Sequence, residues 1–427
     1  MNPPVDSVQI EIARTHNGVP FSEVPTAWSS IGELLRMRAM AEPDRTWMVY
    51  LDEDGSRVEL TRRTFYYRVL GVARHLRREG VTAGSRVATL AHNHPDTVVT
   101  YYALWTLGAT AVPLNPGEDD ERLLFILRNS AAVAVVTRSG YAERLTRLLS
   151  RLESPVRVLC ANDSRESPCI GVDFASVASD GAPPLLPRLH QENAPCLIVY
   201  TSGTTGVPKG VVLTQGNLLV DATAIADWHR IDASAPMMCV LPIHHVNGTV
   251  VTLVTPMVAD SSVVLNRRFR TGTFFETIAS EGVGVVSVVP TLLAFLSGKE
   301  IDRSNLDLSR FRHIICGAGP LTCELAERFE SMYNVPIIHG YGLSETTCYS
   351  CFLPIDLSDE ERRSWLTDHG FPSIGVPIDV NDMAILDGKA GELDENVRGE
   401  IAIRGPNVMF EYLKNPDATH GTFAGDW

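Results

Sequence analysis

The stretch from Tyr200 to Gly210 reads YTSGTTGVPKG; it continues the apolar run CLIVY and is followed by VVLT. It holds three glycines, one lysine and four serine or threonine hydroxyls. Backbone N–H groups of a glycine-rich turn and nearby hydroxyls can surround phosphate oxygens, and a lysine adds a positive charge. The stretch therefore predicts a loop that binds phosphate.

The loop does not match the Walker pattern of P-loop proteins. That pattern has four residues between its glycines and then reads G-K-[ST]. Here Lys209 follows Pro208 and precedes Gly210, so kinases and GTPases of the P-loop class are disfavoured. A flexible surface loop is the simpler alternative, which the combination of hydroxyls, glycines and lysine argues against.

Strand-like and helix-like patterns alternate on both sides of this loop. Residues 31–150 and 196–347 both show the alternation, and runs such as AVAVV suit a parallel sheet covered on both faces. After residue 371, β-branched residues and turns predominate. We expect an α/β fold with two layered α/β subdomains, residues 1–190 and 191–370, and a small β-subdomain, residues 371–427. The second subdomain would hold the phosphate-binding loop and, by the family resemblance described below, the ATP and acyl site.

Composition excludes several classes of protein. The net charge is −14 without a basic cluster, which disfavours a nucleic-acid partner. No apolar run approaches the roughly 18 residues that would span a membrane. The polar N-terminus lacks a signal-peptide core, so a cytoplasmic location is expected. The eight cysteines are irregularly spaced, and the pair Cys348 and Cys351 lacks the second ligand pair of a zinc site, which makes it incidental.

Further motifs follow in a fixed order. They are LPIHHVNG (241–248), ICGAGPL (315–321), HGYGLSET (339–346), GVPIDVNDMAILD (375–387) and RGEIAIRGPNVMFEYLKNPDAT (398–419). Together with the opening loop they resemble the adenylate-forming superfamily, which includes acyl- and aryl-CoA synthetases, adenylation domains and luciferase-like enzymes. The resemblance implies an N-terminal domain of the layered fold predicted above. It also implies ATP, Mg²⁺ and coenzyme A as reactants or cofactors.

The resemblance implies the reaction and the residues that serve it. A carboxylate attacks the α-phosphate of ATP, which gives an acyl-adenylate and pyrophosphate, and the acyl group then passes to coenzyme A. Such a displacement depends on neutralised charge and held reactants. The implied catalytic residues are Lys209, His245 and Glu345, with Thr204 and Glu345 as metal ligands. The implied nucleotide-binding residues are Thr201, Ser202, Gly203, Thr204, Thr205, Gly206, Gly317, Ala318, Gly319, Gly340, Tyr341, Gly342 and Ser344.

The acyl pocket is implied at the second motif. Its expected residues are His245, Val246, Asn247, Gly317 and Leu343, with residues 290–293 and Thr347 nearby. Residues 246–249 contain no acid that would pair with an α-ammonium group, which favours an acyl or aryl carboxylate over an amino acid. His244 is expected to be structural, and His92 and His94 are expected to bind no metal. For His339, contact with the substrate pocket and a structural role remain equal alternatives.

Alternatives to the CoA ligase function are a different acceptor, namely a carrier-protein thiol or an amine, and a small oxyacid substrate such as nitrite. A non-catalytic nucleotide-binding module is a third.

Two departures from the family pattern stand out. Glu411-Tyr412 replaces Gly-Tyr, which is expected to change only a surface turn. The final residues, GTFAGDW, resemble the lead-in to a further segment, so the mobile C-terminal domain with its lysine is expected beyond Trp427.

Overall fold

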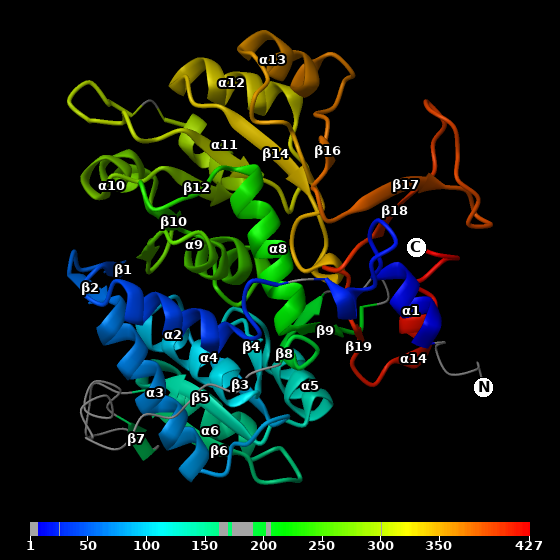
Figure 1. Ribbon diagram of the computed structural model, residues 1–427. Helices are drawn as coiled ribbons and strands as arrows, with labels where there is room; N and C mark the ends of the chain where they lie inside the picture. Colours follow the sequence, from blue (N-terminus) through cyan, green and yellow to red (C-terminus); the bar gives the residue numbers. More distant parts are fainter. Residues whose placement is uncertain (1–6, 25, 162–169, 173–190, 202–205, 300) are drawn as a thin grey trace.

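The computed structural model describes residues 7–24, 26–161, 170–172, 191–201, 206–299 and 301–427. Its strands form two large sheets and one ribbon, and the expected α/β class is confirmed (Figure 1). The first sheet has the order β19 (Glu411–Tyr412), β9 (Lys209–Thr214), β8 (Pro195–Thr201), β4 (Thr110–Leu114), β3 (Arg86–Leu90), β5 (Ala134–Arg138), β6 (Arg157–Ala161) and β7 (Ile170–Val172).

The second sheet has the order β16 (Val376–Pro377), β15 (Cys351–Phe352), β14 (Ile337–Tyr341), β13 (His313–Cys316), β12 (Val285–Val288), β10 (Met237–Cys239), β11 (Val263–Asn266), β1 (Thr46–Leu51) and β2 (Arg57–Thr61). Its central strands, from β14 to β1, are parallel. The ribbon pairs β17 (Asp382–Leu386) with β18 (Glu400–Arg404) and projects from the body of the molecule (Figure 1).

Helices fill the space between the two sheets and cover their outer sides. The inner helices are α2 (Ile31–Ala41), α3 (Arg62–Arg78), α4 (Pro95–Leu107), α8 (Gln215–Trp228), the π-helix η2 (Asn247–Val254) and α9 (Thr255–Val258). α5 (Asp120–Ser130) and α6 (Ser139–Leu149) pack on the first sheet. The second sheet and the helices that accompany it are called the second lobe below, and the first sheet with its helices the first lobe. The helices of the second lobe are α10 (Phe274–Glu281), α11 (Pro290–Ser297), α12 (Cys323–Tyr333) and α13 (Asp359–Thr367). α11 to α13 lie toward the end of the molecule that is away from α5 and α6 (Figure 1). Short 3₁₀ turns are η1 (Phe21–Glu23), η3 (Thr271–Thr273) and η4 (Ser344–Thr346).

The burial of β8 shows why such apolar runs form the sheet. Leu197 and Val199 belong to the main core between the sheets, whereas Ile198 and Tyr200 belong to a separate core under α5 and α6. Successive side chains of a strand point to opposite faces, so a strand covered on both faces is apolar at every position. The same alternation in β9 places Val211 and Leu213 on the inner face and Val212 on the outer face.

The sheets do not divide at the boundaries expected from the sequence. β1 and β2 lie before residue 190 but belong to the second sheet, and β8 and β9 lie after it but belong to the first sheet. Residues 371–427 add β16 to the second sheet and β19 to the first, besides forming the separate ribbon. Hydrophobic patterning reports that a strand is buried and carries no information on which sheet it joins, which is why these boundaries were not visible in the sequence.

The segment from Gly405 to Leu413, here called the connecting segment, is bound to both lobes. The Nδ2 of Asn407 donates to Asp221 Oδ1 of α8 (3.0 Å), to Asn381 Oδ1 (2.9 Å) and to the carbonyl of Tyr349 (3.3 Å). Asn407 is fully buried, and its own Oδ1 accepts a hydrogen bond from Asn381. At the other end of the segment, β19 pairs with β9 of the first sheet. The connecting segment thus fixes the position of one lobe relative to the other.

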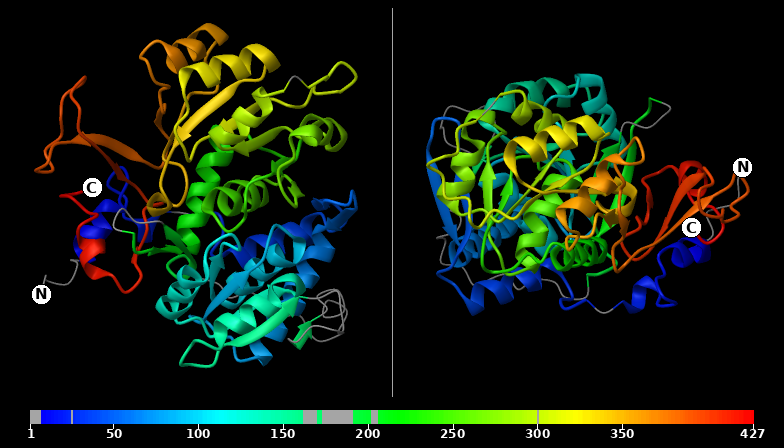
Figure 2. Two further views of the ribbon diagram at one scale, coloured as in Figure 1. Left: turned by 180° about the vertical axis from the view of Figure 1, so that it is seen from behind. Right: turned by 90° about the horizontal axis from the view of Figure 1, so that it is seen from above.

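The two chain ends lie side by side (Figure 2). Ala13 of α1 (Ser7–Ala13) accepts a hydrogen bond from the N–H of Gly405 and packs with Val408 and Phe423, which follows α14 (Pro416–His420). Within the described residues, none of the helices combines the length and hydrophobicity needed to cross a membrane. Cys348 and Cys351 are free and buried.

A pair of buried histidines joins α8 to β13. His229 Nδ1 and His313 Nε2 lie 3.0 Å apart, and both side chains are buried. Burial lowers the pKa of His229 well below its ordinary value, and the neighbouring His313 and Arg312 lower it further. Burial, with a smaller contribution from Arg312, lowers the pKa of His313 to about 3. Both rings are therefore neutral in the folded protein at ordinary pH.

The histidine pair predicts a loss of stability in mild acid. Below about pH 6.5 the unfolded chain binds protons that the folded chain excludes, so the free energy of unfolding falls as the pH is lowered from there toward 3. The free energy of unfolding changes by about 1.4 kcal/mol per pH unit for each histidine that is protonated in the unfolded chain and neutral in the folded chain. Denaturant unfolding across this window measures it, and His313→Asn should give a shallower slope. Equal slopes in the two proteins would show that the pair does not cause the acid sensitivity.

Candidate active site

A cavity of about 980 Å³ opens at the carboxyl ends of strands from both sheets. Thr201 at the end of β8, Val289 just after β12 and residues 318–321 after β13 all line it. The carboxyl ends of parallel strands are where α/β proteins place their ligands, because the loops that follow the strands converge there. The cavity is therefore the candidate active site.

Most of the predicted site residues meet at this cavity. Those that line it are Thr201, His245, Val246, Asn247, Ala318, Gly319, Gly340, Tyr341, Gly342, Leu343, Ser344 and Glu345. Gly206, Lys209 and Gly317 are not among the lining residues. Ser202, Gly203, Thr204 and Thr205 lie outside the described residues. Val289 lines the cavity where residues 290–293 were expected, and the Thr347 hydroxyl instead donates to the carbonyl of Asn407.

The ends of the phosphate-loop candidate are fixed by a pair of antiparallel strands. β8 ends at Thr201 and β9 begins at Lys209, and these two residues face each other in the ladder. At the next pair, a Cβ on Gly210 would lie 2.9 Å from the ring of Tyr200, so only glycine fits opposite this tyrosine. The Tyr200 hydroxyl in turn donates to Asn129 Oδ1 (2.6 Å). Both residues that flank the loop are therefore held by the first sheet.

Tyr412 contacts both charged residues that the sequence identified. Its hydroxyl donates to Glu345 Oε1 (2.5 Å), and the Lys209 ammonium lies 4.4 Å from the centre of its ring. Tyr412 is buried in β19, beside β9, so the expectation that Glu411-Tyr412 forms only a surface turn is wrong. No local pattern pointed to this role, because Tyr412 is 67 residues from Glu345 in the chain.

The short η4 turn that carries Glu345 is tightly held. The N–H of Met409 donates to the Glu345 carbonyl (2.7 Å), and the N–H of Leu343 donates to the Thr346 hydroxyl (3.0 Å). A Cβ on Gly342 would lie 1.9 Å from the carbonyl oxygen of Cys348, so this position requires glycine. The carboxylate of Glu345 therefore projects from a rigid turn at the cavity wall.

Two of the glycines predicted to bind the nucleotide have a packing reason of their own. A Cβ on Gly340 would lie 2.3 Å from the ring of Phe352, and one on Gly317 would lie 2.6 Å from the ring of Tyr349. Ala318 has a positive φ of 59° and, with Gly319, exposes backbone to the cavity. Burial raises the pKa of Tyr341, which keeps this cavity-lining phenol neutral.

The adjacent histidines differ in their position. His245 lines the cavity. Desolvation lowers its pKa, and the negative charge of Glu118 offsets part of this shift. The His244 ring packs on it, with the ring centres 4.5 Å apart, and burial lowers the pKa of His244 to about 3. This arrangement agrees with a site position for His245 and a structural one for His244.

His339 and the segment after α13 complete the wall. His339 lines the cavity, and its Nδ1 lies 2.7 Å from the Ser373 carbonyl, so Nδ1–H donates to that oxygen. This bond holds Phe371, Pro372 and Ile374 at the cavity wall. The sequence analysis missed these three residues, since they lie in a loop outside the recognised motifs.

Comparisons with known proteins agree with this geometry. The family model described as AMP-binding enzyme matches residues 35–413. A sulfoacetate–CoA ligase of Cupriavidus necator is 29% identical, over 94% of this chain and 75% of its own. A feruloyl-CoA synthase of Amycolatopsis is 30% identical, over 84% of this chain and 68% of its own.

Among solved structures, the O-succinylbenzoate coenzyme A synthetase of Bacillus subtilis in complex with AMP superimposes with a TM-score of 0.76. It is 26% identical and covers 92% of this chain and 74% of its own. The family match, the shared fold and the meeting of the predicted motifs at one cavity lead to the same conclusion. This chain belongs to the AMP-binding enzyme family, the adenylate-forming enzymes that its motifs resemble.

Proposed function

We propose that this protein is an ATP-dependent acid–thiol ligase, which adenylates a carboxylic acid and transfers the acyl group to coenzyme A. The observation that carries the proposal is that Tyr412 contacts both Lys209 and Glu345, and that Glu345 lines the cavity at the strand ends. The CoA ligases named among the relatives support coenzyme A as the acceptor.

The first half-reaction forms a bond between a carboxylate oxygen and the α-phosphorus of ATP. The bond from that phosphorus to the bridging oxygen of the β-phosphate breaks, and pyrophosphate leaves. Lys209 would neutralise charge on the leaving phosphates, and the hydroxyls of Thr201 and Ser344 would donate to phosphate oxygens. Catalysis of this kind depends on positioning and charge neutralisation, which a rigid turn and a strand end provide.

Mg²⁺ fits the residues at the cavity. The described residues contain no group of three or more histidine, cysteine or acidic side chains that could hold a metal alone. Glu345 nevertheless supplies one carboxylate, and Mg²⁺ at nucleotide sites is usually held by one or two carboxylates together with phosphate oxygens and water. Bound there, the ion would withdraw charge from the phosphates. Thr204, the other proposed ligand, lies outside the described residues.

In the second half-reaction the coenzyme A sulfur forms a bond to the acyl carbon, and AMP leaves with the electrons of the broken C–O bond. His245 lies at the cavity and is largely neutral, so its ring can face the acyl group without placing a charge there.

Replacing Lys209 tests the proposal. Loss of one well-aimed donor to a developing charge costs about 3 kcal/mol, so Lys209→Ala should lower carboxylate-dependent ATP–pyrophosphate exchange about a hundredfold or more. The exposed Lys389 gives the matched control, and Lys389→Ala should retain the wild-type rate.

A panel of carboxylates identifies the acid, and a thioester mass identifies coenzyme A as the acceptor. Near-wild-type exchange in Lys209→Ala would refute its assignment, and exchange in the absence of any acid would refute the ligase function.

Replacing Tyr412 separates its two contacts. Tyr412→Phe removes the hydrogen bond to Glu345 and keeps the ring beside Lys209, so it should lower exchange roughly tenfold and raise the Mg²⁺ concentration required. Tyr412→Leu also removes the cation–π contact and should lower exchange a further few-fold. Tyr333→Phe is the control, because that hydroxyl donates to the Leu296 carbonyl (2.8 Å) in α11. If Tyr412→Phe and Tyr333→Phe lower exchange equally, Tyr412 has no positioning role.

A further inference from the structure

We propose that Ser287, Asn247 and Tyr349 close the inner end of the cavity and restrict the substrate to short carboxylic acids with a single negative charge. This inference rests on the proposed function, since it assigns the acid that the ligase activates. The three residues are called the end wall below. They come from β12, η2 and the loop after η4, so three separate elements meet there.

The burial of the lining residues shows which end of the cavity is closed. Phe371 and Leu343 are 66% and 42% exposed, which places them at the mouth. Asn247 and Tyr349 also line the cavity but are only 5% and 2% exposed, and Ser287 behind them is fully buried. An acid whose carboxylate meets the nucleotide therefore has its far end directed at the end wall.

Hydrogen bonds hold the end wall together. Ser287 Oγ donates to Asn247 Oδ1 (2.7 Å), and Asn247 Nδ2 donates to the Tyr349 hydroxyl (3.1 Å). Separating these groups would leave buried polar atoms unpaired, which is costly in a desolvated site. The wall therefore resists displacement by a longer substrate.

Tyr349 is also held by contacts with residues outside the end wall. The absence of a side chain at Gly317 lets its ring lie against the backbone of that residue. The ring of Phe352 packs on the other side, with the ring centres 4.5 Å apart. The Tyr349 carbonyl accepts a hydrogen bond from Asn407 of the connecting segment. A different rotamer of Tyr349 would have to break these contacts.

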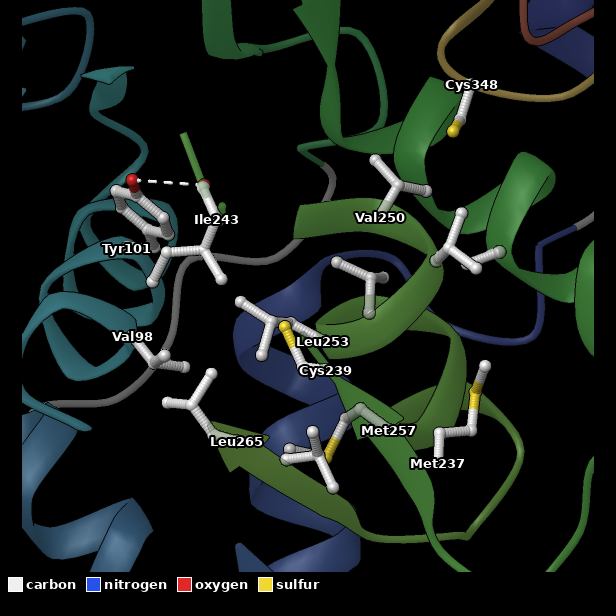
Figure 3. Close-up of a cluster of buried hydrophobic side chains, with 14 of the residues drawn as sticks. Val98, Tyr101, Met237, Cys239, Ile243, Val250, Leu253, Met257, Leu265 and Cys348 are labelled. Carbon is white, nitrogen blue, oxygen red and sulfur yellow. Dashed lines mark hydrogen bonds between the residues drawn. The ribbon is translucent and has the colours of Figure 1, made fainter. Parts of the chain in front are cut away.

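The space beyond the end wall is filled. Val250, Leu253 and Cys239 are fully buried, and Figure 3 shows them with Cys348 in one cluster of apolar side chains. Val250 lies three residues after Asn247 in η2, and Tyr349 belongs to the same buried core as this cluster. Such interiors are packed as densely as crystals of small molecules, which leaves no channel for a long acyl chain.

The charge of the lining limits the acid further. The described residues that line the cavity include no lysine and no arginine. Its histidines, His245 and His339, both have a pKa lowered by desolvation. A second carboxylate or a sulfonate on the substrate would lose its hydration at the end wall without gaining a counter-charge, and an unpaired buried charge is strongly unfavourable. Singly charged acids avoid this cost.

A chain-length series tests the proposal. We expect wild-type kcat/KM for ATP–pyrophosphate exchange to be at least tenfold higher with butanoate than with dodecanoate or with the doubly charged succinate. Tyr349→Ala should shift the optimum toward longer acids, because it removes the wall. Tyr349→Phe keeps the ring, so it should retain the wild-type order of substrates.

The wild-type series is decisive even if Tyr349→Ala fails to fold. Equal or better exchange with dodecanoate or succinate in the wild type would overturn the inference while supporting the ligase function. A folded Tyr349→Ala with an unchanged order of substrates would also overturn it. Absence of exchange with every acid in the wild type would overturn the proposed function, and the inference with it.

Discussion

The buried amide of Asn407 is the interaction on which the rest of the site depends. It joins α8, Asn381 and the loop that contains Tyr349, three segments that are far apart in the sequence. Asp221, its partner on α8, is fully buried, and burial raises the pKa of this carboxyl well above its ordinary value. The raised pKa favours the neutral form of this carboxyl, in which the network joins the lobes without burying a net charge.

The chemistry follows from where the connecting segment leads. Five residues after Asn407 it places Tyr412 against β9, and the phenol and ring of that one residue contact Glu345 and Lys209. Lys209 and Glu345, which we propose act on ATP, thus each have a weak partner in this structure. Breaking a cation–π contact and a single hydrogen bond, so that the two groups can bind phosphate and Mg²⁺, costs less free energy than breaking a direct ion pair. The same segment supports Tyr349, so it also stabilises the acyl end of the cavity.

Patterns local to the chain were readable from the sequence. The apolar runs on either side of Lys209 identified buried strands, and the ordered motifs identified residues such as His245 and Glu345 that meet at one cavity. Features that depend on distant contacts were not readable. The sheet that β1 joins and the burial of Tyr412 are set by pairings across much of the chain. The glycine at 317 was assigned to the nucleotide, whereas the structure adds the packing of Tyr349 as a reason for it.

The central claim is that the connecting segment couples the strand that carries Lys209 to the turn that carries Glu345. Hydrogen–deuterium exchange in Asn407→Ala tests it most directly, because local opening is reported segment by segment. We expect faster exchange in both residues 209–214 and residues 344–349, with α6 unchanged. Faster exchange confined to residues 405–413 would contradict the claim, because the two site segments would then be held independently of Asn407.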